Sequence, residues 1–209
     1  STADALCDIV AMRCADSNNR VQYAALELVP LLSQSVTSDV VDAASSRFVS
    51  CITSALSSSY TAVHGSALLA LQSILRRSSD ANLRSLCPTL CMTCATVRNV
   101  NAKVALLGAL GDVIARNALN AHAVDSSNKL SRSDLDFCVE TSVRAWCTDA
   151  REEVTRANQE LLCCIYEHGF GLRDEDAITD SQRLVDSPEH QQQVRAVLDT
   201  HREAVNAAE

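Results

Sequence analysis

A pattern of small and apolar residues recurs four times along the chain, and each copy reads as one helix. The copies begin at Val21, Val63, Val104 and Val154, each after a short polar stretch. Mostly small or apolar residues follow four, seven and eleven positions after each valine, which is helical spacing. The valines are 42, 41 and 50 residues apart. A period near 40 residues with two helices per unit predicts an all-α solenoid.

Helical spacing and polar breaks predict where the helices lie. We expect a repeat array of four to five helix pairs over 1–168, an acidic loop over 169–188, and a C-terminal helix over 189–209. That last helix is expected to pack on the array or extend it. The individual helices are predicted over 3–15, 20–34, 40–56, 63–75, 81–97, 101–117, 134–147, 151–168 and 189–207.

The composition excludes several classes of structure and function. Aromatic residues make up only 3% of the chain, and strict two-residue alternation is missing, so no sheet is expected. The net charge of −8 argues against nonspecific nucleic-acid binding, which needs a basic surface. We found no run of 18 apolar residues to suggest a membrane span. These features favour a cytoplasmic protein with no membrane or nucleic-acid partner.

Three of the ten cysteines stand in a Cys-x-x-x-Cys-x-x-Cys pattern at Cys87, Cys91 and Cys94. This spacing resembles the cluster-binding loop of radical-SAM enzymes, which follows a strand of an α/β barrel. Here no strand is expected, and offsets of four and seven place all three thiols on one helix face. A zinc site would need a fourth ligand, and none is close in sequence. We interpret the three as buried helical thiols and expect no metal, no cofactor and no enzymatic activity.

Two segments carry a family resemblance. The fifth and sixth predicted helices contain Leu83, Leu86, Pro88 and Leu90, then Asn99 and Asn101, then Val104 and Gly108-Ala109-Leu110. This order is similar to a HEAT repeat, which often has proline in its first helix and valine before an Ala-Leu run in its second. The segment 149–157 also resembles the opening of a second HEAT helix, with Thr155 where arginine is usual.

The turns inside the helix pairs are the candidate binding site. In a solenoid these turns line up along one edge, and here they carry amides, a tyrosine and basic residues. TOG-type domains are HEAT stacks of similar length that bind tubulin through this edge, and the chain resembles them in its repeat count and turn composition. It differs at the first turn, where Asn18 or Asn19 replaces the usual aromatic anchor. The predicted partner-binding residues are Asn19, Arg20, Tyr60, Arg98, Asn101, Lys103 and Arg151.

The resemblance implies a non-enzymatic, cytoskeletal module that binds tubulin or microtubules. The alternative is a HEAT-type adaptor or scaffold that holds a different protein in its concave surface, on the faces of the second helices. A cysteine-cluster enzyme is the third class, and it would require Cys87, Cys91 and Cys94 to hold an iron–sulfur cluster.

The cysteines give a first testable expectation. Most lie within helical apolar stripes, where a free cysteine behaves as a small hydrophobic side chain. Thiol titration of the denatured chain without reductant should therefore find close to ten free thiols. A count near zero would contradict both the reducing compartment and the assignment of these residues to the core.

Overall fold

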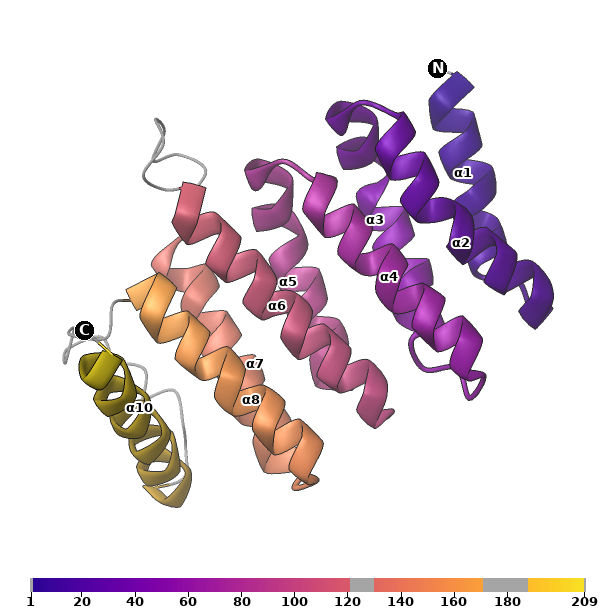
Figure 1. Ribbon diagram of the computed structural model, residues 1–209. Coiled ribbons are helices and arrows are strands. Elements are labelled where there is room, and N and C mark those ends of the chain that lie inside the picture. The colour runs from indigo at the N-terminus through magenta and orange to yellow at the C-terminus, as the bar shows by residue number, and fades with distance from the viewer. Residues whose placement is uncertain (1, 121–129, 171–187, 209) are drawn as a thin grey trace. The chain divides into compact units, whose positions relative to one another are not determined.

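A computed structural model describes residues 2–120, 130–170 and 188–208, and Figure 1 shows that they form successive helices. No strand occurs within these residues, which confirms the all-α class. The predicted helices agree with the observed ones to within a few residues at most ends. The elements are α1 (Thr2–Cys14), α2 (Asn19–Ser35), α3 (Ser38–Ala55), α4 (Thr61–Arg77), α5 (Asp80–Thr96), α6 (Val100–Asn120), α7 (Arg132–Thr148), α8 (Glu152–Cys164), the π-helical segment η2 (Ile165–Phe170) and α10 (Pro188–Ala208).

The chain divides into two compact units, and the division cuts across α5 and α6. The N-terminal unit extends to Leu86 and includes Val97–Ala105. The C-terminal unit comprises Cys87–Thr96 and the chain from Leu106 onward. The predicted acidic loop over 169–188 lies largely outside the described residues.

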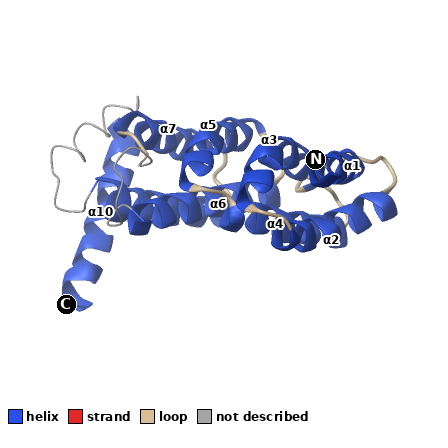
Figure 2. Ribbon diagram, turned by 90° about the horizontal axis from the view of Figure 1, so that it is seen from above, coloured by secondary structure: helices blue, strands red, loops and turns tan. Residues whose placement is uncertain are grey.

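The N-terminal unit is built of two layers of helices. Helices α1 and α3 pack side by side in one layer, and α2 and α4 form the other (Figure 2). Their facing sides bury Leu26, Val29, Phe48, Ile52 and Leu71, each no more than 2% exposed. Asn82 at the start of α5 donates to the hydroxyls of Ser45 and Ser78, both at 3.0 Å, so polar contacts accompany the apolar ones.

Each second helix buries the same positions, counted from its N-cap. The N-caps are Asn18, Tyr60, Asn99 and Arg151, which are 42, 39 and 52 residues apart. Four residues lie seven positions after a cap and are at most 4% exposed: Ala25, Ala67, Leu106 and Asn158. Four lie eleven positions after a cap and are 0% exposed: Val29, Leu71, Leu110 and Leu162. Every second helix therefore buries a stripe at the same positions, and the stripe is apolar at each of them except Asn158.

The register predicted for the third repeat was wrong by two residues. The counterpart of Val63 and Val154 is Ala102, which is 0% exposed, whereas Val104 is only half-buried. The reason is the cap: the Asn99 side chain accepts a hydrogen bond from the Ala102 N–H at 3.0 Å, so the helix begins at Val100. The sequence comparison aligned valines without locating this cap.

In the C-terminal unit, α7 packs against α8, and α10 packs against α8. A buried amide joins the first of these pairs. The Ser142 hydroxyl donates to Asn158 Oδ1 at 3.1 Å, and Asn158 Nδ2 donates to the Val154 carbonyl at 2.9 Å. Helix α6 meets α8 where the Cys164 thiol lies 3.3 Å from the Gly111 carbonyl. None of the described helices is long and apolar enough to cross a membrane.

The Ser142–Asn158 hydrogen bond gives a test of the α7–α8 packing. Both residues are 0% exposed, so Asn158→Ala leaves the buried Ser142 hydroxyl with only the longer contact of 3.4 Å to the backbone carbonyl of residue 158. We expect a loss of about 1–3 kcal/mol in the free energy of unfolding. Adding Ser142→Ala should cost little more, and a double-mutant cycle by urea denaturation measures the coupling. Asn206→Ala on the exposed face of α10 is the control and should stay within about 0.5 kcal/mol of the parent. Strict additivity of the two changes would contradict the assignment.

Candidate functional site

The three turns of the N-terminal unit lie at the same end of its helices (Figure 1). These are the α1–α2 turn, the α3–α4 turn and the segment before α6. Of the residues predicted to bind a partner, Arg20, Tyr60, Arg98 and Asn101 are exposed, and Asn19 is half-buried. We call these five residues the turn edge. It combines two guanidinium groups, two amides and one aromatic ring.

The first two turns are held by the same device. Gln22 is the fourth residue after the Asn18 cap, and its Nε2 donates to the Cys14 carbonyl at 3.0 Å. His64 is the fourth residue after the Tyr60 cap, and its Nδ1 lies 2.8 Å from the Leu56 carbonyl. Because a carbonyl only accepts, His64 carries its proton on Nδ1. In each case a side chain of the second helix satisfies a carbonyl at the end of the first, which fixes the turn.

Tyr60 is the aromatic residue of the turn edge. It occupies an N-cap position, where Ser, Thr, Asp or Asn is preferred, and its side chain makes no capping hydrogen bond. Its backbone is nevertheless fixed, because its N–H donates to the Ser58 hydroxyl at 3.2 Å and its carbonyl accepts from the His64 N–H at 3.0 Å. The tyrosine is 59% exposed. A rigid backbone therefore presents an aromatic ring to solvent.

The prediction that Lys103 lies on an exposed edge was wrong, because this residue is only 5% exposed. Lys103 is the fourth residue after the Asn99 cap, the position that Gln22 and His64 hold in the first two pairs. Those two side chains reach back toward the preceding helix instead of out into solvent. Because the predicted register of α6 was wrong by two residues, the valine pattern did not align Lys103 with Gln22 and His64.

Arg151 belongs to the C-terminal unit, and its charge is already compensated. Its Nε lies 2.7 Å from Asp149 Oδ1, and its Nη2 lies 2.6 Å from Asp149 Oδ2. The Asp149 side chain is 6% exposed, whereas that of Arg151 is 51% exposed. This two-point contact raises the pKa of Arg151 above its ordinary value. Arg151 therefore serves first as the partner of a buried carboxylate.

The cysteines that cluster in the structure differ from the three that the sequence pattern grouped. Cys138 of α7 joins Cys87 and Cys91 of α5, whereas Cys94 stands outside this cluster. Cys138 Sγ lies 3.4 Å from the Cys87 sulfur and 3.8 Å from the Cys91 sulfur, and all three side chains are buried. Hydrogen bonds from Cys138 and then Cys87 lower the pKa of Cys91, and hydrogen bonding to Cys87 and Cys91 together with burial raises that of Cys138. Sequence analysis missed Cys138, because its only signal was a cysteine in an apolar stripe far along the chain.

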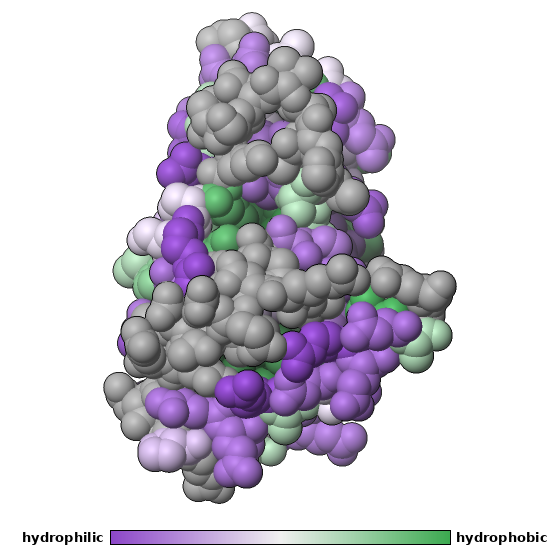
Figure 3. Space-filling model, turned by 90° about the vertical axis from the view of Figure 1, so that its left-hand side faces the viewer, coloured by the Kyte–Doolittle hydropathy of each residue, from purple (hydrophilic) through white to green (hydrophobic). Residues whose placement is uncertain are grey.

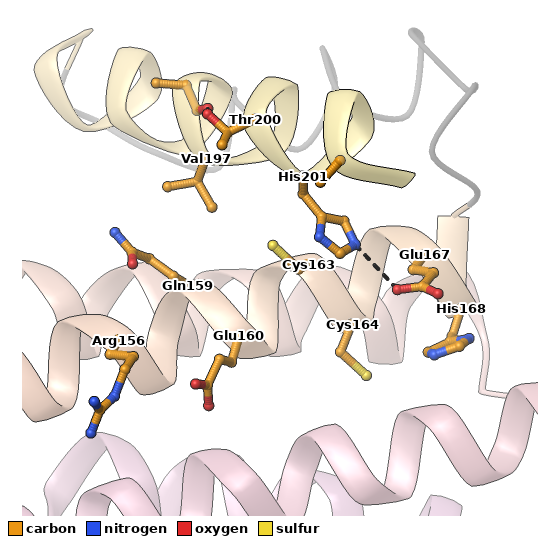
Figure 4. A pocket seen from close by; sticks show the side chains of 12 residues that line it. Arg156, Gln159, Glu160, Cys163, Cys164, Glu167, His168, Val197, Thr200 and His201 are labelled. Carbon is orange, nitrogen blue, oxygen red and sulfur yellow. Dashed lines mark hydrogen bonds and ion pairs between the residues drawn. The ribbon is translucent and has the colours of Figure 1, made fainter. Parts of the chain in front are cut away.

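A pocket of about 690 Å³ lies between α8, η2 and α10 in the C-terminal unit (Figure 4). Its lining includes Glu167, which faces His201 of α10 across 3.2 Å. Burial and then the Glu167 charge raise the pKa of Cys164 to about 11, so this thiol stays protonated near neutral pH. The neighbouring Cys163 is shifted in the same direction for the same reasons. The pocket therefore offers no activated cysteine nucleophile.

The described surface on the side where α10 lies is mostly hydrophilic, with small hydrophobic areas between polar side chains (Figure 3). Nine of the exposed large hydrophobic residues belong instead to the N-terminal unit, on α1, α2, α4 and the turn edge. They are Leu6, Ile9, Met12, Val21, Tyr23, Leu28, Leu31, Tyr60 and Leu69, and each is at least 37% exposed.

Comparison with known structures supports a helical-repeat fold. The MAST/Orbit N-terminal domain matches with a TM-score of 0.69 and 17% sequence identity, over 97% of this chain and 80% of that chain. An engineered protein covers 94% of this chain and 96% of its own, at 15% identity and a TM-score of 0.38. No protein-family model matches the sequence. No curated protein matches it either. At this identity the likeness to the MAST/Orbit domain establishes the HEAT-like helical-repeat fold.

The different surroundings of Lys103 and Arg98 give a test that separates them. Lys103→Glu reverses a buried charge and should lower the free energy of unfolding by at least about 2 kcal/mol. Arg98→Glu changes an exposed side chain and should stay within about 0.5 kcal/mol of the parent. Lys103→Met keeps the aliphatic stem and should fall between them. Chemical denaturation followed by circular dichroism measures all three, and equal effects of the two glutamates would contradict the burial of Lys103.

Proposed function

We propose that this chain is a non-enzymatic protein-interaction module that binds tubulin through the turn edge. The fold supports a role in binding, because stacked helix pairs present extended surfaces. The resemblance of the turns to those of TOG-type domains supports tubulin as the partner. A cytoplasmic, cytoskeleton-associated location follows from that partner and belongs to the same proposal.

The observation that carries the proposal is the exposed ring of Tyr60. Hydrogen bonds at its N–H and carbonyl fix the Tyr60 backbone, and its side chain plays no part in capping α4. Tyrosine is enriched among the few interface residues that supply most of a binding energy. TOG-type domains usually have their aromatic anchor in the first turn, and we propose that Tyr60 supplies it here from the second.

The charge of the turn edge suits an acidic partner. Arg20 and Arg98 are exposed on the same edge as Tyr60, although the chain as a whole carries a net charge of −8. Such a local basic surface mainly speeds encounter with an acidic protein such as tubulin, and its effect weakens with added salt. Lys103 and Arg151 leave the proposed binding set, because one is buried and the other is paired with Asp149.

A second candidate function is an adaptor that binds a different protein on the faces of its second helices. The specific observation in its favour is that Leu28 and Leu31 of α2 and Leu69 of α4 are 47%, 60% and 58% exposed. An apolar partner, such as an amphipathic helix, would bury such side chains. This adaptor would use leucines, whereas the tubulin proposal uses the turn edge.

The proposal is tested by measuring the affinity of the chain for soluble tubulin at low salt. Tyr60→Ala should weaken binding by about 2 kcal/mol, the threshold for a dominant interface residue, which is about 30-fold in Kd. Arg20→Glu with Arg98→Glu should cost about 0.5–1 kcal/mol per ion pair and reduce the salt dependence. Both variants should keep the parent's melting temperature, because the side chains are exposed.

Two controls decide between the candidate functions. Arg76→Glu reverses an exposed charge in the last turn of α4, at the opposite end of that helix from Tyr60, and should leave tubulin binding unchanged. Leu31→Gln with Leu69→Gln changes the second-helix faces and should also leave it unchanged. Loss of binding in the leucine variant but not in Tyr60→Ala would replace the tubulin proposal with the adaptor.

A further inference from the structure

The cysteine cluster of the C-terminal unit brings together three sulfur atoms from two helices. Cys87 and Cys91 lie one helical turn apart on α5, and Cys138 faces them from α7. The three sulfur atoms all lie within 4.8 Å of one another. Cys94 is equally buried on the same helix but is not part of the group. Burial alone therefore does not account for the convergence.

The spacing of the sulfur atoms matches that of thiolates around one metal ion. A metal–sulfur bond of about 2.3 Å separates two sulfur ligands by about 3.8 Å in a tetrahedral site and about 4.0 Å in a trigonal one. The measured separations of 3.4 Å and 3.8 Å, with the third below 4.8 Å, lie around these values. Small rotations of the side chains would place all three sulfurs at bonding distance from a common centre.

The surroundings favour a metal ion that is stable with three sulfur ligands. Within the described residues, the group contains no fourth cysteine, histidine or carboxylate. Asp134, one helical turn before Cys138, is engaged at the start of α7, where its Oδ2 accepts from the Ser131 N–H and hydroxyl, both at 2.7 Å. Structural zinc takes four ligands, and thiolate sulfur selects soft ions. Cuprous copper is soft and is satisfied by three sulfur ligands.

We propose that Cys87, Cys91 and Cys138 form a three-sulfur site for a cuprous ion. Binding replaces thiol protons with the metal, and each thiol that ligates as a thiolate releases one proton to solvent. With two thiolates and one thiol the site carries a net charge of −1, whereas three thiolates would bury −2. The site is independent of the turn edge, because none of its residues belongs to that surface.

The experiment uses the full chain, reduced and kept anaerobic, with cuprous ion buffered by bathocuproine disulfonate. Loss of the coloured copper–chelator complex reports transfer to the protein. We expect one tight equivalent in the parent. Cys87→Ala, Cys91→Ala and Cys138→Ala should each weaken it by more than about 100-fold, beyond the roughly 10–100-fold that losing a supporting group costs. Cys94→Ala is the matched control and should keep the parent affinity.

A second control addresses the other thiols. The Cys163→Ala, Cys164→Ala double variant removes the adjacent cysteines of α8 and should also keep the tight equivalent. X-ray absorption of the parent loaded with one equivalent should show three sulfur neighbours around copper, and it does not depend on any variant folding. Two sulfur neighbours, equal losses in Cys94→Ala and the cluster variants, or zinc binding that excludes cuprous ion would each overturn the proposal. Tubulin binding should be the same with and without copper, so the two proposals fail separately.

Discussion

Close approach between helices is the constraint on which this fold depends. Aromatic residues make up 3% of the sequence, so the core must be filled by small and medium side chains. Such side chains bury enough apolar surface only where helices lie near one another. The residues seven and eleven positions after each N-cap meet this need, since they are at most 4% exposed in all four second helices. Cysteine fits the same requirement, which explains why five of the ten thiols are at most 1% exposed, namely Cys14, Cys87, Cys91, Cys94 and Cys138.

This packing decides which residues of the turns are exposed. Gln22 and His64 hold the first two turns to the ends of the preceding helices, and Arg20 and Tyr60 of these turns are exposed. Tyr60 is exposed because its neighbours, not its own side chain, satisfy the local backbone. The same geometry buries Lys103, which occupies the position of Gln22 and His64. Whether a turn residue is buried or exposed therefore depends on its position in the sequence relative to the N-cap.

Helical periodicity was sufficient to predict the fold class and the approximate helix bounds, because burial of one stripe leaves a local signal in the sequence. It was not sufficient to predict the burial of Lys103. That burial depends on the Asn99 cap, which sets a helix register two residues away from the one that the valine pattern predicted. Nor did it group Cys138 with Cys87 and Cys91, because that contact depends on how α7 packs against α5. The pairing of Arg151 with Asp149 could have been predicted, since the two are two residues apart in the turn, but the two-point contact could not.

In a chain whose helices resemble one another, folding must also select the right neighbour for each helix. An apolar stripe alone would accept several of them, and misassembly between similar units is a common failure of repeat proteins. Asn158 discriminates, because its amide oxygen is satisfied by a helix that presents a hydroxyl at the position of Ser142. A mispaired helix would leave that oxygen buried without this hydrogen bond, at a cost of about 1–3 kcal/mol. Ser45 and Asn82 provide a second such match between α3 and α5. These buried polar groups therefore give each helix a specific partner among helices of similar sequence.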